Sequence, residues 1–397
     1  MATSPTFSPW PSYNDDEVAA VAKTLGSNKV NYWTGQQCRD FERAFAGWSG
    51  SAYAIALTNG TVALDLPLKC LGIGPGDEVI VTPRSFIASV STVVNAGATP
   101  VFADVELDSG NISAVTIEQV ITPRTRAIIP VHIAGWPCDM PAIMELAKAQ
   151  GISVIEDCAQ AHGAAIEGKM VGSFGHAAAW SFCQDKIMTT GGEGGMVTTQ
   201  DEALWNAMWS FKDHGKDWDV VYNRTHQPGF RWVHQSFGTN WRMLEMQAAI
   251  GILQLNYISD WTARRTAIAK TIASALAPYA DIVRCPLPDP DVETHAFYRL
   301  YAYVRLEALA SGWSRDRIVA EVNAAGAPLL HGTCSEIYLE TAFDNSGWRP
   351  PSRLTNAKAL GETSLMFLVH PTLTDAEVQY VCEVTAKILD AARLKAC

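Results

Sequence analysis

Short apolar segments alternate with helical stretches between about residue 77 and about residue 199. The segments EVIVT, PVFADV, AIIPVHI, SVIEDC, AAAWSF and GMVTT show almost no polar alternation, as expected of strands that are covered on both faces. Helical patterns separate them, in SFIASVSTVVNAG, near 114–121 and in MPAIMELAKAQG. This order predicts an α/β fold with a mostly parallel, doubly wound sheet. Ligands of such sheets bind at the carboxyl ends of the strands, so polar residues there are the first candidates for a site.

The remaining chain predicts a smaller α+β domain. Residues 201–214 and 241–275 have helical patterns, and an irregular aromatic loop, DWDVVYNRTHQPGFRWVHQSFGTN, joins them. Three prolines in RCPLPDPD, at 284–291, stop both helix and central strand and mark a linker. Beyond it, HAFYRLYAYVRL alternates like a strand, while RDRIVAEVNAAG and DAEVQYVCEVTAKILDAARL have helical periodicity. We predict a large domain at 1–283, with an N-terminal arm and interface helices, and a small C-terminal domain at 284–397.

Composition narrows the class of protein. The 397 residues are 48% hydrophobic and 18% charged, which is typical of a globular enzyme of two or three domains. The formal net charge is −11, so we expect no nucleic-acid partner. No signal peptide and no apolar run of membrane-spanning length is visible, and nine cysteines without CxxC or zinc spacing fit a reducing cytosol. We therefore predict a cytoplasmic protein with no membrane partner and no metal.

The segment TNGTVALDL places Asn59, Gly60 and Thr61 just before a helical pattern. Glycine lets the backbone approach a ligand closely, and free N–H groups at a helix start form an anion site together with a threonine hydroxyl. An ordinary helix cap is the competing interpretation.

The segment VIEDCAQAHGA is a predicted buried strand that ends in Glu156 and Asp157. A carboxylate there is costly unless a cation, such as a protonated heterocyclic nitrogen, pairs with it. We take Asp157 as the functional carboxylate, because Glu156 should point to the opposite face of the sheet. Gln160 and His162 follow within one turn, where each could contact a ligand or satisfy backbone groups.

Lys186 lies between a predicted strand and a glycine-rich loop in AWSFCQDKIMTTGGEGGMV. A lone lysine is normally a solvated surface residue, but a lysine held in such a pocket can form a Schiff base. Ser181, five residues earlier, can reach an anion. A lysine for the aldehyde, a carboxylate for the ring nitrogen, and hydroxyls with backbone amides for the phosphate are what a pyridoxal phosphate site needs.

With these segments in view, the chain resembles the sugar aminotransferases of the DegT/DnrJ/EryC1/StrS family. These are fold type I pyridoxal phosphate enzymes of the aspartate aminotransferase superfamily. The resemblance covers nearly the whole chain. It rests on NYWTGQQCRDFERAFA, TNGTVAL, GDEVIVTPRSFIAS, ATPVFADVE, VIEDCAQAHGA, WSFCQDKIMTTGGEGG, TNWRMLEMQAAIG and HPTLTDAEVQYV. One departure is the extra glycine of TTGGEGG, where the family pattern is TTGEGG.

The resemblance implies a role for each matching residue. Lys186 is implied as the Schiff-base lysine and Asp157 as the partner of the ring nitrogen. The other implied cofactor contacts are Gln160 near the phenolic oxygen, Gly60, Thr61 and Ser181 at the phosphate, Phe86 stacked on the ring, and Asn240, which reaches the phosphate across a homodimer interface.

The resemblance also implies L-glutamate as amino donor and a nucleotide-diphosphate keto-sugar as acceptor, in amino-sugar, polysaccharide or lipopolysaccharide biosynthesis. The KxxTTG…EGG loop leans toward amination at C4 of a 4-keto-6-deoxyhexose. His214, Arg231 and His331 fall where family members contact substrate, although each could also be structural or serve dimer packing. Since position 186 is lysine and not the histidine of related dehydratases, transamination is favoured over dehydration.

Three other functions compete with this one. An acceptor without a nucleotide, of the inosose or aminohydroxybenzoate type, keeps the cofactor and changes the substrate. A non-catalytic pyridoxal phosphate-binding regulator is disfavoured by the intact pair of Lys186 and Asp157. A nicotinamide dehydrogenase is set aside, because no G-x-G-x-x-G follows the first predicted strand.

Overall fold

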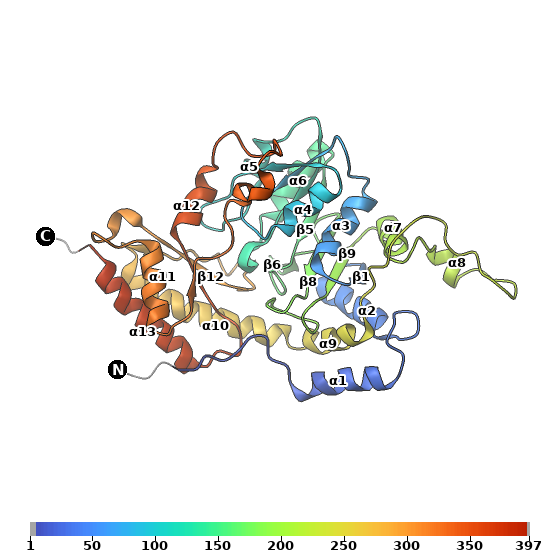
Figure 1. Ribbon diagram of the computed structural model, residues 1–397, viewed down its shortest axis with the longest axis horizontal. Helices are drawn as coiled ribbons and strands as arrows, with labels where there is room; N and C mark the ends of the chain where they lie inside the picture. The colour runs from blue at the N-terminus through green and yellow to red at the C-terminus, as the bar shows by residue number, and fades with distance from the viewer. Residues whose placement is uncertain (1–4, 395–397) are drawn as a thin grey trace.

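The computed structural model describes residues 5–394, so Cys397 and the ends of the two predicted domains lie outside the described residues. A seven-stranded sheet has the order β1-β9-β8-β5-β4-β2-β3 (Figure 1). Only β9 runs antiparallel to its neighbours, which confirms the mostly parallel sheet. The strands are β1 (Tyr53–Leu57), β2 (Glu78–Val81), β3 (Thr99–Phe102), β4 (Thr125–Ile129), β5 (Ser153–Asp157), β8 (Ala177–Ser181) and β9 (Gly195–Thr199).

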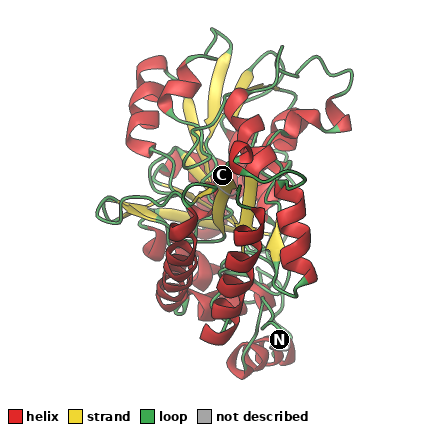
Figure 2. Cartoon of the chain, turned by 90° about the vertical axis from the view of Figure 1, so that its left-hand side faces the viewer, coloured by secondary structure: helices red, strands yellow, loops and turns green. Residues whose placement is uncertain are grey.

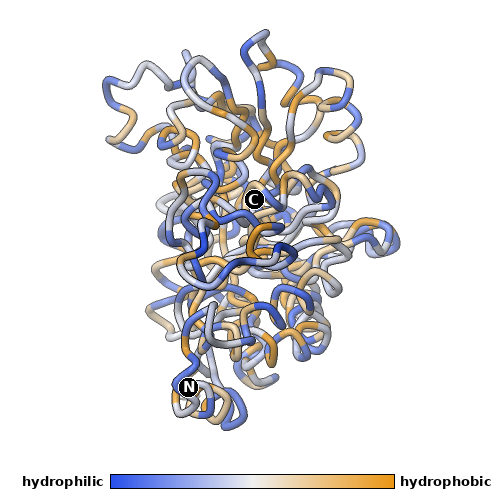
Figure 3. The backbone as a smooth tube through the Cα atoms, turned by 90° about the vertical axis from the view of Figure 1, so that its right-hand side faces the viewer, coloured by the Kyte–Doolittle hydropathy of each residue, from blue (hydrophilic) through white to orange (hydrophobic). Residues whose placement is uncertain are grey.

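Helices flank this sheet on both sides (Figure 2), and hydrophobic segments run through the middle of the molecule (Figure 3). Neighbouring residues of β2 show why. Val79 and Val81 pack with Leu64 of α3 in one core cluster, whereas Ile80 packs with Ile143 of α6 in another. A strand buried on both faces therefore carries no polar alternation. The covering helices are α3 (Gly60–Cys70), α4 (Ala88–Asn95), α5 (Ala114–Glu118), α6 (Met140–Gln150) and α7 (Glu202–Lys212).

The structure corrects the helix predicted over 241–275. Residues 241 and 242 are extended: Arg242 forms a bridge with Leu57, and Thr58 N donates to Trp241 O at 3.0 Å. The helical pattern is then divided at Asn256 and Tyr257 into α9 (Glu245–Leu255) and α10 (Ile258–Leu276). The aromatic loop contains one short helix, α8 (Trp218–Tyr222). Before β1, the sequence forms α1 (Asp15–Gly26), with an Asn14–Glu17 capping box, and α2 (Gln37–Ser49).

A four-stranded antiparallel sheet, β10-β12-β14-β13, forms the centre of a smaller unit at the left of Figure 1. Its core also takes in Ile268, Ile272 and Leu276 of α10. The boundary at 284 stays a prediction, and we propose that the small unit begins within α10. Its elements are β10 (Val283–Arg284), β12 (Leu300–Val304), α11 (Arg315–Ala324), β13 (Leu329–Leu330), α12 (Thr355–Thr363), β14 (Ser364–Phe367) and α13 (Asp375–Ala392). A separate three-stranded sheet contains β6 (Ala165–Ile166), β7 (Lys169–Met170) and β11 (Glu293–Thr294).

The N-terminal segment ties the two units together. Phe7 packs against the small core, and Ser8 Oγ donates to Glu377 Oε2 of α13 at 3.0 Å. Two residues later, Trp10 Nε1 donates to the backbone oxygen of Lys186 at 2.9 Å. The segment therefore links the terminal helix to the lysine loop. Within residues 5–394, no helix combines the length and hydrophobicity needed to cross a bilayer. The cytoplasmic location stays a prediction.

Three buried histidines predict acid sensitivity. Burial lowers the pKa of His162 and His295 to about 3 and that of His370 to about 4, with nearby cations adding to the effect at His162 and His370. In the unfolded chain they titrate near the ordinary value of about 6.5, so below that pH the unfolded state binds more protons. Stability should then fall by about 1.4 kcal/mol per pH unit for each histidine between about pH 6.5 and 4.

Urea unfolding at a series of pH values measures this slope. His162→Leu should reduce this slope by about 1.4 kcal/mol per pH unit, which is the share of one histidine. His234→Asn, at an exposed position, is the matched control and should leave the slope unchanged. An identical slope in His162→Leu and the parent protein would contradict the prediction.

Candidate active site

A cavity of about 810 Å³ lies between the carboxyl edge of the large sheet and the small unit. Asp157 ends β5 and Ser181 ends β8, and both line the cavity. Tyr301 of β12 and Met366 of β14 line it from the small unit. Its volume is in the range of pockets that hold a cofactor together with a substrate. The rule that ligands bind at strand carboxyl ends therefore located the cavity correctly.

Asp157 is buried at the end of β5, and its carboxylate has two hydrogen-bond donors. Ser89 Oγ donates to Oδ2 at 2.7 Å, and the N–H of Ala159 donates to Oδ1 at 3.1 Å. Burial raises the pKa of Asp157 above its ordinary value, although both hydrogen bonds and the positive charge of Lys186 act in the opposite direction. A buried carboxylate beside a cavity is a site for a cation that enters with a ligand.

Lys186 lines the same cavity, with its side chain 15% exposed. Its Nζ lies 3.9 Å from Oδ1 of Asp185 and 5.1 Å from the centroid of the Tyr298 ring. The glycine-rich loop that follows folds back on the lysine segment, since Gln184 N donates to Gly192 O at 3.0 Å. Gly191 and Gly192 have φ values of 88° and 115°, so the additional glycine is accommodated in a left-handed turn that other residues rarely adopt.

The start of α3 forms an anion cradle. Asn59 caps the helix by accepting from Val62 N at 3.0 Å, while the N–H groups of Gly60 and Thr61 precede any intrahelical acceptor. A Cβ at Gly60 would lie 2.6 Å from Cβ of Ser181, so glycine is needed for β8 to approach this closely. The cap predicted as a competing interpretation is present, and the residues that carry the free amides and the hydroxyls, Gly60, Thr61 and Ser181, line the cavity.

Gln160 and Phe86 complete the cavity lining that the sequence singled out. Gln160 Oε1 accepts from Ala134 N at 2.8 Å, which fixes the side chain and leaves its NH₂ group for a ligand. Phe86 is 66% exposed, so its ring is available for stacking. Seven of the eight predicted cofactor contacts therefore line one cavity, although their roles stay predictions.

The remaining predicted residues lie elsewhere. Asn240 is exposed and forms a backbone bridge with Asp213. His214 has a positive φ of 61°, and Arg231 lies on the exposed aromatic loop. His331 is exposed and lies 3.4 Å from Asp316, although its chain neighbours Leu330 and Gly332 line the cavity. Within this one chain, none of the four is among the cavity-lining residues.

Sequence reasoning missed several residues that shape the cavity. Ser89 holds Asp157 and is itself 3.0 Å from Ser85, one helical turn earlier. The spacing of these serines after a buried strand was the available signal. Tyr298 and Arg299 also line the cavity, where the alternation of HAFYRLYAYVRL predicted only a strand.

Glu156 has the structural role that its opposite orientation predicted. Its carboxylate accepts from the N–H groups of Gly172, Phe174 and Gly175 at 2.7, 2.9 and 2.7 Å, and it lies 3.2 Å from His132 Nε2. These bonds occupy both oxygens. The carboxylate therefore anchors the loop before β8 on the face away from the cavity.

His132, Glu156 and Cys158 are residue types that bind metals, and they lie close together. The ligand atoms of His132 and Glu156, however, are already engaged in hydrogen bonds. Cys138 N donates to Nδ1 of His132 at 2.9 Å, so the ring proton is on Nε2 and is directed at Glu156. A metal would have to displace these hydrogen bonds. His162 also has a packing role, because its ring lies against Trp180 and Phe182.

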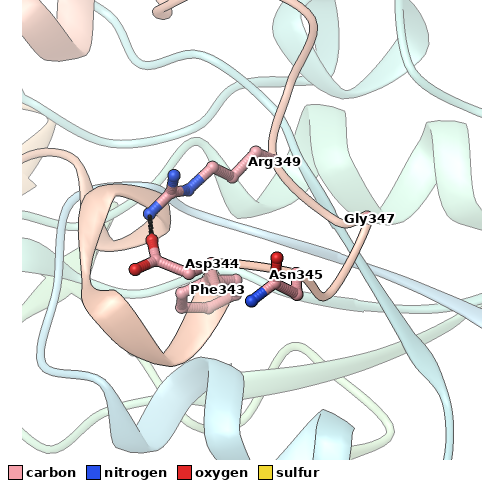
Figure 4. Close-up of a pocket in the computed structure, with 5 residues that line it drawn as sticks. All are labelled: Phe343, Asp344, Asn345, Gly347 and Arg349. Carbon is pink, nitrogen blue, oxygen red and sulfur yellow. Dashed lines mark hydrogen bonds and ion pairs between the residues drawn. The ribbon is translucent and has the colours of Figure 1, made fainter.

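A second hollow, of about 530 Å³, lies on a surface loop (Figure 4). It is lined by Phe343, Asp344, Asn345, Gly347 and Arg349. The Arg349 guanidinium pairs with Asp344 and donates to the carbonyl oxygens of Tyr338 and Glu340 at 2.8 and 3.2 Å. Since the Arg349 guanidinium is already paired within the loop, it stabilises the loop and is not available to bind a ligand in the hollow.

The residues of the large cavity fit pyridoxal phosphate. Asp157 is a buried carboxylate that lacks a full counter-ion, Gly60 allows close approach at a helix start, and Lys186 provides a primary amine. These match the three chemical demands of that cofactor: a partner for the ring nitrogen, a phosphate cradle and an attachment point.

Comparisons with known proteins agree with a pyridoxal phosphate site. GDP-perosamine synthase from Caulobacter vibrioides is 37% identical over 387 residues, covering 94% of this chain and 98% of that protein. dTDP-3-amino-3,4,6-trideoxy-alpha-D-glucose transaminase from Streptomyces venezuelae is 35% identical over 357 residues, covering 89% and 87%. The crystal structure of an aminotransferase from Psychrobacter cryohalolentis is 57% identical, with a TM-score of 0.96 and coverage of 97% and 99%. A model of the DegT/DnrJ/EryC1/StrS aminotransferase family matches residues 11–385, so the chain belongs to this family of pyridoxal phosphate-dependent aminotransferases.

Proposed function

We propose that this enzyme transfers the amino group of L-glutamate to a keto-sugar carried on a nucleoside diphosphate, at C4 of a 4-keto-6-deoxyhexose. The observation that carries the proposal is the placement of Lys186 and Asp157 in one cavity, in a chain similar over nearly its whole length to enzymes of nucleotide sugars. Those two relatives are named for GDP- and dTDP-linked sugars. Their shared element is the nucleoside diphosphate. The lean toward C4 rests on the sequence of the lysine loop.

In the proposed mechanism, Lys186 holds the cofactor covalently and, when released, its Nζ takes up and returns the proton of the donor α-carbon. Pyridoxal phosphate supplies the electron sink for the pair of electrons left by that proton. Asp157 keeps a proton on the ring nitrogen, and Ser89 fixes the carboxylate that does so.

The remaining contacts follow the sequence predictions. Gly60, Thr61 and Ser181 hold the phosphate, Gln160 donates to the phenolic oxygen, and Phe86 covers the ring. Both half-reactions then use one cavity.

We further propose a homodimer in which Asn240 reaches the partner's phosphate site. The aromatic loop supports this, because Phe230, Trp232 and Phe237 are 75%, 84% and 100% exposed in the single chain. Exposed aromatic side chains in one segment are typical of a surface that packs against another subunit.

The experiment that tests the proposal is incubation with L-glutamate and a panel of keto-sugar nucleotides that vary the base and the position of the ketone. Mass spectrometry should detect conversion of the ketone to an amine, fastest for a 4-keto-6-deoxyhexose. The free nucleoside diphosphate should inhibit by competition. If no nucleotide sugar gains nitrogen while an inosose does, the proposed substrate class is wrong.

A further inference from the structure

The active-site cavity contains a second cation besides Lys186. Arg299 lies just before β12 and lines the cavity, with its side chain 12% exposed. A guanidinium is always charged and presents several donors in a fixed plane, a geometry that matches a carboxylate. Placing such a group in a substrate cavity creates a binding site for an anion.

Arg299 is held in place without being fully used. Its Nη1 donates to the backbone oxygen of Tyr298 at 2.9 Å, and its guanidinium lies 4.1 Å from the centroid of the Tyr298 ring. Its ion pair with Oδ2 of Asp185 is 3.8 Å long, beyond hydrogen-bond distance. Nε and Nη2 are therefore available to a ligand, on a side chain that is already oriented.

The Asp185 carboxylate lies between Lys186 and Arg299. It lies 3.9 Å from Lys186 Nζ, accepts a hydrogen bond from the Tyr298 hydroxyl, and faces Arg299. Burial would raise the pKa of Asp185, but Lys186, the Tyr298 hydroxyl and Arg299 together lower it, so the group is ionised at neutral pH. Because Arg299 lies beyond hydrogen-bond distance of this carboxylate, its donors stay open to an incoming anion even when Lys186 is bonded to the cofactor.

We propose that Arg299 binds a carboxylate of the amino donor. This rests on the proposed function, since it names the donor contact of the same site. Lys186 Nζ and Arg299 Nη2 lie 3.9 and 3.8 Å from the same Asp185 carboxylate, so an anion on Arg299 is close to the reacting amine. An amino acid carries its α-carboxylate on the carbon that reacts. The diphosphate of a nucleotide sugar is separated from a C4 ketone by the sugar ring, which makes it a poorer match for Arg299.

The test is the first half-reaction of the pyridoxal phosphate-loaded enzyme, followed by stopped-flow absorbance of the yellow cofactor. Arg299→Gln should raise the saturation constant for L-glutamate about 30-fold or more, because one partner of a charge pair is lost. The limiting rate should change less, and Arg299→Lys should fall between. Arg43→Gln, on an exposed helix surface, is the matched control and should behave like the parent enzyme.

Amides of the donor identify the carboxylate that Arg299 contacts. L-Glutamine lacks the γ-carboxylate and L-isoglutamine lacks the α-carboxylate. With the compound that lacks the contacted group, the parent enzyme and Arg299→Gln should bind alike. A merely structural role for Arg299 would weaken all three donors equally, and this result would overturn the proposal.

The second half-reaction separates the remaining outcomes. Starting from the aminated enzyme, Arg299→Gln should convert the keto-sugar nucleotide normally. A defect confined to this step would show that Arg299 recognises the diphosphate of the acceptor and would overturn the donor assignment. If no keto-sugar accepts nitrogen, the proposed function fails, but the glutamate step still measures the role of Arg299. An unchanged glutamate constant in Arg299→Gln refutes this inference alone.

Discussion

Lys186→Ala is expected to lower amino transfer by about four orders of magnitude or more, the combined effect of losing a covalent attachment point and a general base. Of the described residues that line the cavity, Lys186 is the one lysine. No neighbouring amine can therefore replace it. Lys186→Arg should be equally inactive, because a guanidinium keeps the charge beside Asp185 but neither attacks an aldehyde nor gives up its proton.

The covalent bond can be measured without a substrate. After incubation with pyridoxal phosphate and reduction with borohydride, the parent protein should gain the mass of one cofactor on the peptide that contains Lys186. Lys186→Ala should gain none. Lys169→Ala, at an exposed position, is the matched control and should be labelled like the parent. Labelling of Lys186→Ala at another lysine would show that the attachment point is wrongly assigned.

The same variant tests the shared site. In a hybrid dimer of Lys186→Ala and Asn240→Ala protomers, one site would regain both wild-type residues if Asn240 acts across the interface. Mixing two inactive or weakened variants should then restore part of the activity. No recovery would place Asn240 in its own chain's site or outside the site altogether.

The sequence predicted the sheet well because burial on both faces leaves a simple signal. The central residues of β2, β5 and β8 are apolar without alternation, and each strand lies where it was expected. The prediction over 241–275 was wrong at its start, since Trp241 and Arg242 add to the edge of the sheet through long-range pairing with Thr58 and Leu57. Local periodicity carries no information on such a contact.

The residues of the site likewise divide into those with a local sequence signal and those placed by long-range packing. Asp157, Ser181 and Gly60 lie at strand ends and a helix start, positions that a pattern identifies. Arg299 comes to the cavity only because the small unit packs against the large sheet. Its partnership with Asp185 links positions 114 residues apart in the chain. Neither local pattern nor the family resemblance predicts this pair, because only the packing of the two units brings it together.

Asp157→Asn is expected to slow the proton transfer by about three orders of magnitude while the cofactor still binds. The amide cannot keep a proton on the ring nitrogen, so the electron sink is weakened. Lys186 and the cradle at Gly60 are untouched, so borohydride labelling should persist. Single-turnover bleaching with L-glutamate measures the rate. Retention of the parent rate would exclude Asp157 as the ring-nitrogen partner.

The neighbouring carboxylate is the matched control. Glu156→Gln places an NH₂ group against backbone donors that now reach a carboxylate oxygen, at a cost of about 3 kcal/mol for a buried group. This variant should unfold at a lower temperature but keep the parent rate per folded molecule. A slower rate in Asp157→Asn and a lower melting temperature in Glu156→Gln would distinguish a catalytic role from a structural one at adjacent residues of one strand.

Asp157 should also affect the pH dependence of stability, but in the direction opposite to that of the three buried histidines. Because burial raises the pKa of Asp157, the cofactor-free folded chain binds that proton more tightly than the unfolded chain, and its stability falls as pH rises above the ordinary carboxyl range. At pH 8 the cofactor-free Asp157→Asn variant should therefore melt a few degrees above the parent. Added pyridoxal phosphate should stabilise the parent more, since the protonated ring nitrogen then pairs with the carboxylate. This account of the carboxylate would be contradicted if the variant melted lower than the parent without cofactor, or if added cofactor raised both melting temperatures equally. In this account, the buried Asp157 carboxylate lowers the stability of the cofactor-free protein, and the bound cofactor restores that stability by providing the missing counter-ion.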